Sequence, residues 1–179
     1  SKALTHLDAI VGLACRVGAD PAGRALVDYL ETSRIKAIDM TEETNRHTAA
    51  YTAVVDPQGE LVVGLADMEI YDHLDRRYWS SRTDKLTGWD AWCLDTNLPQ
   101  PGLQYLSTLT NRPRLYAVVS SPSKGLRLKS FLRHINTLIL NVAEASVLTG
   151  QSHCGIGSAE EAAQLLCATG VHRALVTQG

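Results

Sequence analysis

Hydrophobic residues fall into runs of strand length that alternate along the chain with stretches of helical spacing. Residues 9–17 form a continuous apolar run and predict a buried strand. Asp20 and Pro21 follow as a helix cap and a first-turn proline. The apolar positions behind them repeat at the spacing of an amphipathic helix: Ala22, Ala25, Leu26, Tyr29 and Leu30.

The next segment has a different pattern, with two β-branched runs on either side of a turn signal. Asp56, Pro57, Gln58 and Gly59 stand between these runs, so residues 48–66 predict a β-hairpin outside any larger sheet. A polar and aromatic stretch at 71–88 follows and is interpreted as helical.

Strand and helix patterns then alternate to the end of the sequence. The predicted strands are 89–95, 115–120, 137–141 and 173–177, and the predicted helices are 100–110, 122–133, 142–149 and 159–169. Ser158 and Glu161 form a capping-box pattern for the last helix, which Gly170 would close. Strands separated by single helices predict an α/β fold with a doubly wound, mainly parallel sheet in a Rossmann-like three-layer arrangement.

Composition narrows the class of protein. The 179 residues suit one domain, with 45% hydrophobic and 20% charged residues and a formal net charge of −2. This balance argues against nucleic-acid or membrane binding through a basic face. No apolar run approaches the roughly 20 residues of a membrane helix, and the first residues do not form a signal peptide. The four Cys and six His are scattered, which predicts a reducing, cytoplasmic setting and no zinc site.

Ligands of open α/β sheets bind at the carboxyl ends of the strands, and polar residues follow four of the predicted strands. These candidate residues are Asp95 and Asn97, Ser120, Ser121 and Lys124, Asn141 and Glu144, and Thr177 and Gly179.

Asn141 and Glu144 have two compatible interpretations. Asn is a good helix cap, and a Glu three residues later bonds back to the cap. The same carboxylate could organise a hydrated Mg²⁺. Lys124 is either a solvent-exposed helix lysine or a phosphate contact near a helix start. The sequence contains no G-x-x-x-x-G-K-[ST] phosphate loop.

Taken together, these segments resemble the ribokinase/PfkB family of carbohydrate and nucleoside kinases. "RVGADPAGRALVDYL" resembles the family's V-G-x-D-x-x-G segment, and "TAAYTAVVDPQGELVVGLADMEIYDHL" resembles the strands of its β-lid. "LDTNLP", "VVSSPSKGLRL" and "LNVAEASVLTG" resemble segments of the pseudouridine-kinase branch. "GVHRALVTQG" resembles the strand before the family's nucleotide loop.

The resemblance implies a ribokinase-like fold with a lid at about 46–67, and transfer of the ATP γ-phosphoryl group to a sugar hydroxymethyl group. The implied substrate is a nucleoside or pentose, first of all pseudouridine, and the implied cofactors are ATP and Mg²⁺. The implied site residues are Asn141, Lys124, Thr177 and Gly179 for the nucleotide and Glu144 for the metal. The implied substrate residues are Asp95 and Asn97 in the sugar pocket and Thr48 and Tyr51 on the lid.

Two family segments have no match in the sequence. The general-base Asp of a Gly-Ala-Gly-Asp segment is absent, and so is the Gly-Gly-x-x-x-Asn segment that binds sugar hydroxyls. We therefore interpret residues 1–179 as the central part of a longer kinase domain and expect no kinase activity from them alone. The alternative is a degenerate kinase fold that binds or regulates without chemistry. A dehydrogenase is a distant third hypothesis, because no G-x-G-x-x-G follows a strand. The edges of the lid strands are candidate surfaces for a homodimer.

Overall fold

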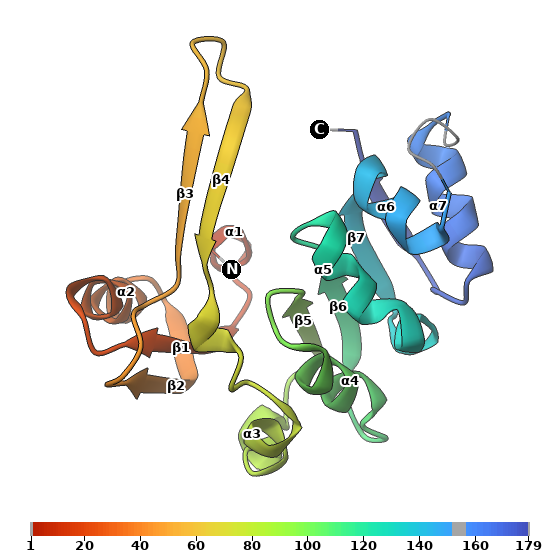
Figure 1. Ribbon diagram of the computed structural model, residues 1–179. Helices are drawn as coiled ribbons and strands as arrows, with labels where there is room; N and C mark the ends of the chain where they lie inside the picture. Colours follow the sequence, from red (N-terminus) through yellow and green to blue (C-terminus); the bar gives the residue numbers. More distant parts are fainter. Residues whose placement is uncertain (1, 152–156, 179) are drawn as a thin grey trace. The chain divides into compact units, whose positions relative to one another are not determined.

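The protein folds into two compact units, Ser1–Asp72 and His73–Gly179. The computed structural model describes residues 2–151 and 157–178 (Figure 1). Among the described residues, no helix is long and apolar enough to cross a membrane. Parallel strands alternate with helices in both units, so the predicted α/β class is confirmed.

The first unit begins with a short helix, α1 (Lys2–Thr5), and a β–α–β segment. Strand β1 (Val11–Gly18) leads into helix α2 (Pro21–Thr32), which returns to strand β2 (Ile35–Glu43). β1 and β2 pair in parallel and form a two-stranded sheet of their own.

Strand β2 is absent from the sequence-based prediction. Its buried positions include a charged residue, Asp39, so the strand lacks the apolar run or clean alternation that would indicate it.

Helix α2 begins as predicted but presents a different face to the sheet. Asp20 caps it through the backbone N–H of Gly23, and Pro21 is its first residue. Gly23 and Leu30 are buried, whereas Leu26 and Tyr29 are 47% and 44% exposed. The periodicity correctly predicts a helix, but only part of its apolar stripe is covered within the chain.

The predicted hairpin is confirmed as β3 (Ala50–Val55) and β4 (Leu61–Asp67), an antiparallel pair separate from both other sheets. Its turn follows the predicted chemistry. The Asp56 carboxylate accepts hydrogen bonds from the backbone N–H groups of Gln58 and Glu60, both at 2.9 Å, and Gly59 has a φ of 87°.

The helix predicted over 71–88 is wrong as a single element. The structure has three short helices there: η1 (Glu69–Tyr71), α3 (Arg76–Ser80) and η2 (Thr83–Leu86). The Asp75 side chain caps α3 through the Tyr78 N–H. Such a local side-chain bond restarts the helix and interrupts any continuous one.

The second unit is a four-stranded parallel sheet in the order β5-β6-β7-β8, with connecting helices. Its strands are β5 (Ala91–Asp95), β6 (Arg114–Val118), β7 (Thr137–Asn141) and β8 (Ala174–Thr177). Its helices are α4 (Gln100–Thr108), α5 (Pro122–Gly125), η3 (Leu126–His134), α6 (Val142–Thr149) and α7 (Ala159–Ala168). The helix predicted over 122–133 is split into α5 and η3.

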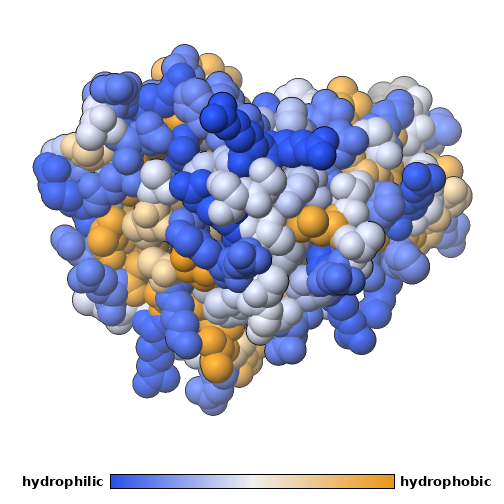
Figure 2. Space-filling view, turned by 90° about the horizontal axis from the view of Figure 1, so that it is seen from below, coloured by the Kyte–Doolittle hydropathy of each residue, from blue (hydrophilic) through white to orange (hydrophobic). Residues whose placement is uncertain are grey.

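Burial alternates along these strands. Leu94, Leu115, Leu138 and Leu140 are buried, whereas intervening residues such as Cys93 are partly or fully exposed. Adjacent strands joined by right-handed crossovers place their connecting helices on the same face of a sheet. The core of this unit therefore lies between the sheet and its helices. Figure 2 shows one face of the protein, on which hydrophilic residues predominate and hydrophobic residues gather in places.

Candidate functional site

The carboxyl ends of the four parallel strands meet at one edge of the sheet in the second unit. The register pairs Asp95 with Val118 and Asn141 with Thr177, so β5 ends level with β6 and β7 ends level with β8. Val118 is paired with Ile139, so β7 and β8 extend two residues further. Because the strands run in the same direction (Figure 1), the polar residues predicted to follow them lie along one edge, within a single compact unit. Gly179 lies outside the described residues.

Asn141 and Glu144 form the capping box at the start of α6. The Asn141 side-chain oxygen accepts the Glu144 backbone N–H at 2.9 Å, and Glu144 Oε2 accepts the Asn141 N–H at 2.8 Å. The capping interpretation of this pair is thus confirmed. Asn141 occupies the last position of β7, so the same two bonds fix the turn from strand to helix.

The Glu144 carboxylate is buried, and within the described ranges its compensation is the hydrogen bond from Asn141 without a cation. The residue is only 6% exposed, and among the described residues no ion pair involves it. A buried carboxylate is stabilised by hydrogen bonds or by a cation, and the positive end of a helix dipole contributes further. Its oxygens are ligands of the kind that Mg²⁺ prefers. The residues present therefore fit a cation at this position.

That cation would have few protein ligands. In the described part of the chain, no group of three His, Cys, Asp or Glu side chains lies close enough to hold a metal ion. Mg²⁺ keeps several waters and is commonly held through one or two carboxylates together with phosphate oxygens. A single carboxylate at this edge fits that mode, and it does not fit a zinc site with four protein ligands.

Lys124 is tied to the loop after β5. Its ammonium group donates to the side-chain oxygen of Asn97, and the Asn97 amide donates to Asp95 Oδ1. The Asn97 backbone N–H also donates to Asp95 Oδ1, at 2.7 Å. Lys124 and Asn97 are half-buried, so neither is a freely solvated side chain. The three residues form a chain of hydrogen bonds from an ammonium to a carboxylate.

A second basic residue in this region, Arg127, was not predicted from the sequence. Arg127 Nη1 donates to the backbone carbonyls of Thr96, Asn97 and Leu98 at 2.9, 3.1 and 2.9 Å. It thereby holds the loop that carries Asn97. Its position three residues after Lys124, on the same helical side, is the signal that could have indicated it.

The neighbouring loop is also fixed. Thr96 is 1% exposed, and its hydroxyl lies 2.9 Å from the Ser120 hydroxyl and accepts the Ser120 backbone N–H at 2.9 Å. The loops after β5 and β6 are therefore joined by hydrogen bonds of the Thr96 side chain.

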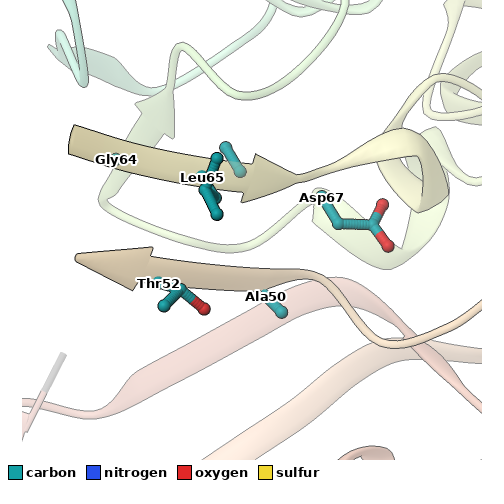
Figure 3. Close-up of a pocket in the computed structure, with 6 residues that line it drawn as sticks. Ala50, Thr52, Gly64, Leu65 and Asp67 are labelled. Atoms are coloured by element: carbon teal, nitrogen blue, oxygen red, sulfur yellow. The ribbon is translucent and has the colours of Figure 1, made fainter. Parts of the chain in front are cut away.

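The hairpin in the first unit carries an open hollow on one face (Figure 3). The register places Ala50 opposite Asp67 and Thr52 opposite Leu65, so these four residues share that face. Tyr51 alternates to the other face, where its ring covers Gly64. The sequence predicted Tyr51 as a lid residue, but Tyr51 does not line the hollow, whose remaining lining residues are Gly64 and Ala66.

Thr48 precedes the hairpin and does not belong to its strands. It is 7% exposed, and its hydroxyl accepts the Gly18 N–H at 2.9 Å and donates to Asp20 Oδ1 at 2.7 Å. The polar groups of Thr48 are therefore already occupied within the first unit.

The sequence profile of the pfkB family carbohydrate kinases matches residues 1–179. The chain belongs to this family. Among curated proteins from Escherichia coli K12, an uncharacterized sugar kinase, YeiI, is 22% identical over 160 residues (89% of this chain, 44% of the relative). A pseudouridine kinase is 24% identical over 164 residues (91% of this chain, 52% of the relative).

Solved structures agree with the pfkB assignment. A carbohydrate kinase from Agrobacterium tumefaciens superposes with a TM-score of 0.84 at 27% identity, over 99% of this chain and 56% of the other. A ribokinase from Thermotoga maritima gives a TM-score of 0.75 at 17% identity, over 94% and 54%. The ribokinase-like fold is confirmed. The chain spans about half the length of the curated relatives it matches.

Proposed function

We propose that this protein is part of a kinase that transfers the γ-phosphoryl group of ATP, with Mg²⁺, to the hydroxymethyl group of a nucleoside or pentose. The observation that carries the proposal is the buried Glu144 carboxylate, held at a strand end by Asn141 and without a cationic partner in the described residues. Family membership makes phosphoryl transfer the reaction that this arrangement would serve.

The side chains at the sheet edge would bind the metal, the nucleotide and the sugar according to their chemistry. Glu144 would hold the metal, which when bound neutralises charge on the phosphate oxygens. Cationic and hydrogen-bonding groups would bind the nucleotide, and the loop after β5 would face the sugar. The proposed nucleotide residues are Asn141, Lys124, Thr177 and Gly179, and the proposed sugar residues are Asp95 and Asn97.

The charge distribution supports an anionic ligand in the second unit. His73–Gly179 contains 11 Lys and Arg residues and seven Asp and Glu residues, whereas Ser1–Asp72 contains six and 12. The excess of positive charge thus belongs to the unit that carries the sheet edge. Such a field attracts a polyphosphate.

Pseudouridine is the first substrate that we propose to test, with pseudouridine 5′-phosphate as the product. Support comes from the relative named pseudouridine kinase, which matches 91% of this chain at 24% identity. Ribose and other nucleosides are the competing substrates in the same assay.

We further propose that residues 1–179 are the central part of a longer kinase domain. They contain no Gly-Ala-Gly-Asp segment, so they lack the aspartate that would take the proton of the attacking hydroxyl group. The reading frame beyond Gly179 decides between an enzyme and a binding module. A downstream Gly-Ala-Gly-Asp supports the enzyme, and a stop codon directly after Gly179 contradicts it.

The proposed function predicts turnover only from a chain of family length. Such a form should phosphorylate at least one nucleoside or pentose, in the presence of Mg²⁺ and ATP, as isothermal titration calorimetry would measure. The 179-residue chain assayed in parallel should bind Mg·ATP without turnover. A family-length form that turns over none of these compounds contradicts the kinase and leaves the binding module.

We also propose a homodimer through the hairpin. Its two strands pair with no other strand among the described residues, so both edges are open. Large apolar side chains are exposed on it: Tyr51, Val54, Val55, Val62, Val63 and Leu65. Sedimentation of the 179-residue chain should show dimers that Val63→Lys converts to monomers. A wild-type chain that stays monomeric at all concentrations would exclude this interface.

A further inference from the structure

A cluster of hydrogen bonds joins three segments of the first unit at the base of the hairpin. The Asp20 carboxylate accepts the Gly23 N–H at 2.8 Å, the Thr48 hydroxyl at 2.7 Å and the Thr48 N–H at 2.7 Å. The Thr48 hydroxyl in turn accepts the Gly18 N–H at 2.9 Å. The end of β1, the start of α2 and the approach to β3 are thus bonded to one another.

Glycines allow these segments to come so close. A Cβ at Gly18 would lie 2.6 Å from the Thr48 backbone nitrogen and 2.6 Å from the Arg46 carbonyl oxygen. A Cβ at Gly23 would overlap the Gly18 carbonyl oxygen. Both are buried, so no side chain larger than hydrogen fits where the chain passes.

The electrostatics of the cluster favour an ionised carboxylate. The backbone N–H groups of Thr48 and Gly23, with the Thr48 hydroxyl, lower the pKa of Asp20 from 3.8 to about 2. The group therefore stays charged at any ordinary pH, and its hydrogen bonds are of the stronger, charge-assisted kind.

We propose that Asp20 and Thr48 anchor the hairpin as a lid, and that Asp20 is a positioning residue for lid closure. This inference rests on the proposed kinase function, since it gives the hairpin the role of a lid. In this proposal Thr48 fixes the end of the hairpin where β3 begins, and it is not a sugar ligand.

The hairpin depends on its base for orientation. All described side chains of β3 and β4 are exposed, and an isolated two-stranded hairpin is only marginally stable. Thr48 lies two residues before the first strand. On the other side the chain is held by the buried Ile70 and by an ion pair of Arg46 with Glu69 at 3.1 Å. Hinges of moving lids lie at such element ends.

Asp20→Asn separates the anchor from the helix cap. Both bonds from Gly23 and the Thr48 hydroxyl go to Oδ1, while Oδ2 accepts the Thr48 N–H. Asn caps helices as well as Asp, but its NH₂ group would face a backbone N–H at Thr48. The substitution therefore keeps α2 capped and breaks one side of the anchor.

The test is residue-resolved amide exchange by NMR on the 179-residue chain without ligands. Asp20→Asn and Thr48→Val should each speed exchange at position 48 and through Ala50–Asp67 by about tenfold or more, while the amides of α2 after Pro21 change less than about twofold. Thr48→Ser keeps the hydroxyl and should restore wild-type exchange. Asp75→Asn, at the cap of α3, is the matched control and should leave the hairpin unchanged.

Two results would overturn the proposal. One is unchanged hairpin exchange in both anchor variants, and the other is an equal rise across α2, β1 and the hairpin, which marks a purely structural role. If Asp20→Asn does not fold, Thr48→Val against Thr48→Ser decides alone. No nucleotide is used, so an absence of kinase activity would not affect the outcome.

Discussion

Glu144→Gln should weaken Mg²⁺-dependent nucleotide binding by the 179-residue chain about 10–100-fold, and lower turnover of a family-length form by a similar factor. The expected cause is the loss of the negative charge that would hold the metal. Gln also serves at the third position of a capping box, so its side-chain oxygen can still accept the Asn141 N–H. The free energy of unfolding should therefore change by no more than about 0.5 kcal/mol.

Glu161→Gln is the matched control for this substitution. Glu161 stands three residues after the cap Ser158 of α7, as Glu144 does after Asn141, but it is exposed. Its Oε2 accepts the N–H of Gly157, the residue before the cap, at 2.8 Å, so it also bonds to backbone at the start of its helix but is not buried. Titration calorimetry and urea unfolding of both variants are the measurements. If Glu144→Gln reduces stability as much as binding, or leaves binding unchanged, Glu144 is a cap alone.

Gly102→Ala should destabilise the protein by about 2–3 kcal/mol. Gly102 lies in the first turn of α4, where a Cβ would overlap the carbonyl oxygen of Leu74 and lie 3.2 Å from a Trp79 ring carbon. The obstacle is backbone, which cannot rotate away as a side chain would. Trp79 is 3% exposed and donates its ring N–H to that same carbonyl at 2.9 Å, so the contact cannot relax without breaking this bond.

Helix propensity by itself predicts that Gly102→Ala stabilises the protein, because it favours Ala over Gly by up to about 1 kcal/mol. Gln104→Ala, at an exposed position of the same helix, tests propensity without the clash and should change stability by no more than about 0.5 kcal/mol. Chemical unfolding monitored by circular dichroism measures both. A Gly102→Ala variant as stable as the wild type would show that α4 does not approach Leu74 so closely.

Local chemistry in the sequence predicted several elements well. The cap at Asp20 with Pro21, the turn at Asp56–Gly59 and the capping box at Asn141 each depend on side chains bonding to backbone within four residues. Such bonds need no distant partner, so sequence spacing alone reveals them. The parallel sheet was predicted for another reason: the alternation of strands with single helices is itself visible in the hydrophobic pattern.

The sequence pattern did not predict strand β2 or the buried face of α2, because contacts with distant residues decide both. The sequence of β2 has a charged residue, Asp39, at a buried position, so its hydrophobic pattern does not indicate a strand. The apolar stripe of α2 is continuous in sequence, yet the close approach of Gly23 to Gly18 turns Leu30 inward and leaves Leu26 exposed.

The candidate site divides in the same way. By itself, the sequence determined which strands end in polar residues and that a carboxylate follows Asn141 by three positions, because strand ends and caps are local features. Only the tertiary structure decided that Glu144 is buried, that Arg127 holds the loop of Asn97, and that Thr48 is bonded to Asp20. Each of the two contacts joins residues 28 or more positions apart, and burial depends on every neighbour in space. The spacing of residues along the sequence therefore does not indicate such partners.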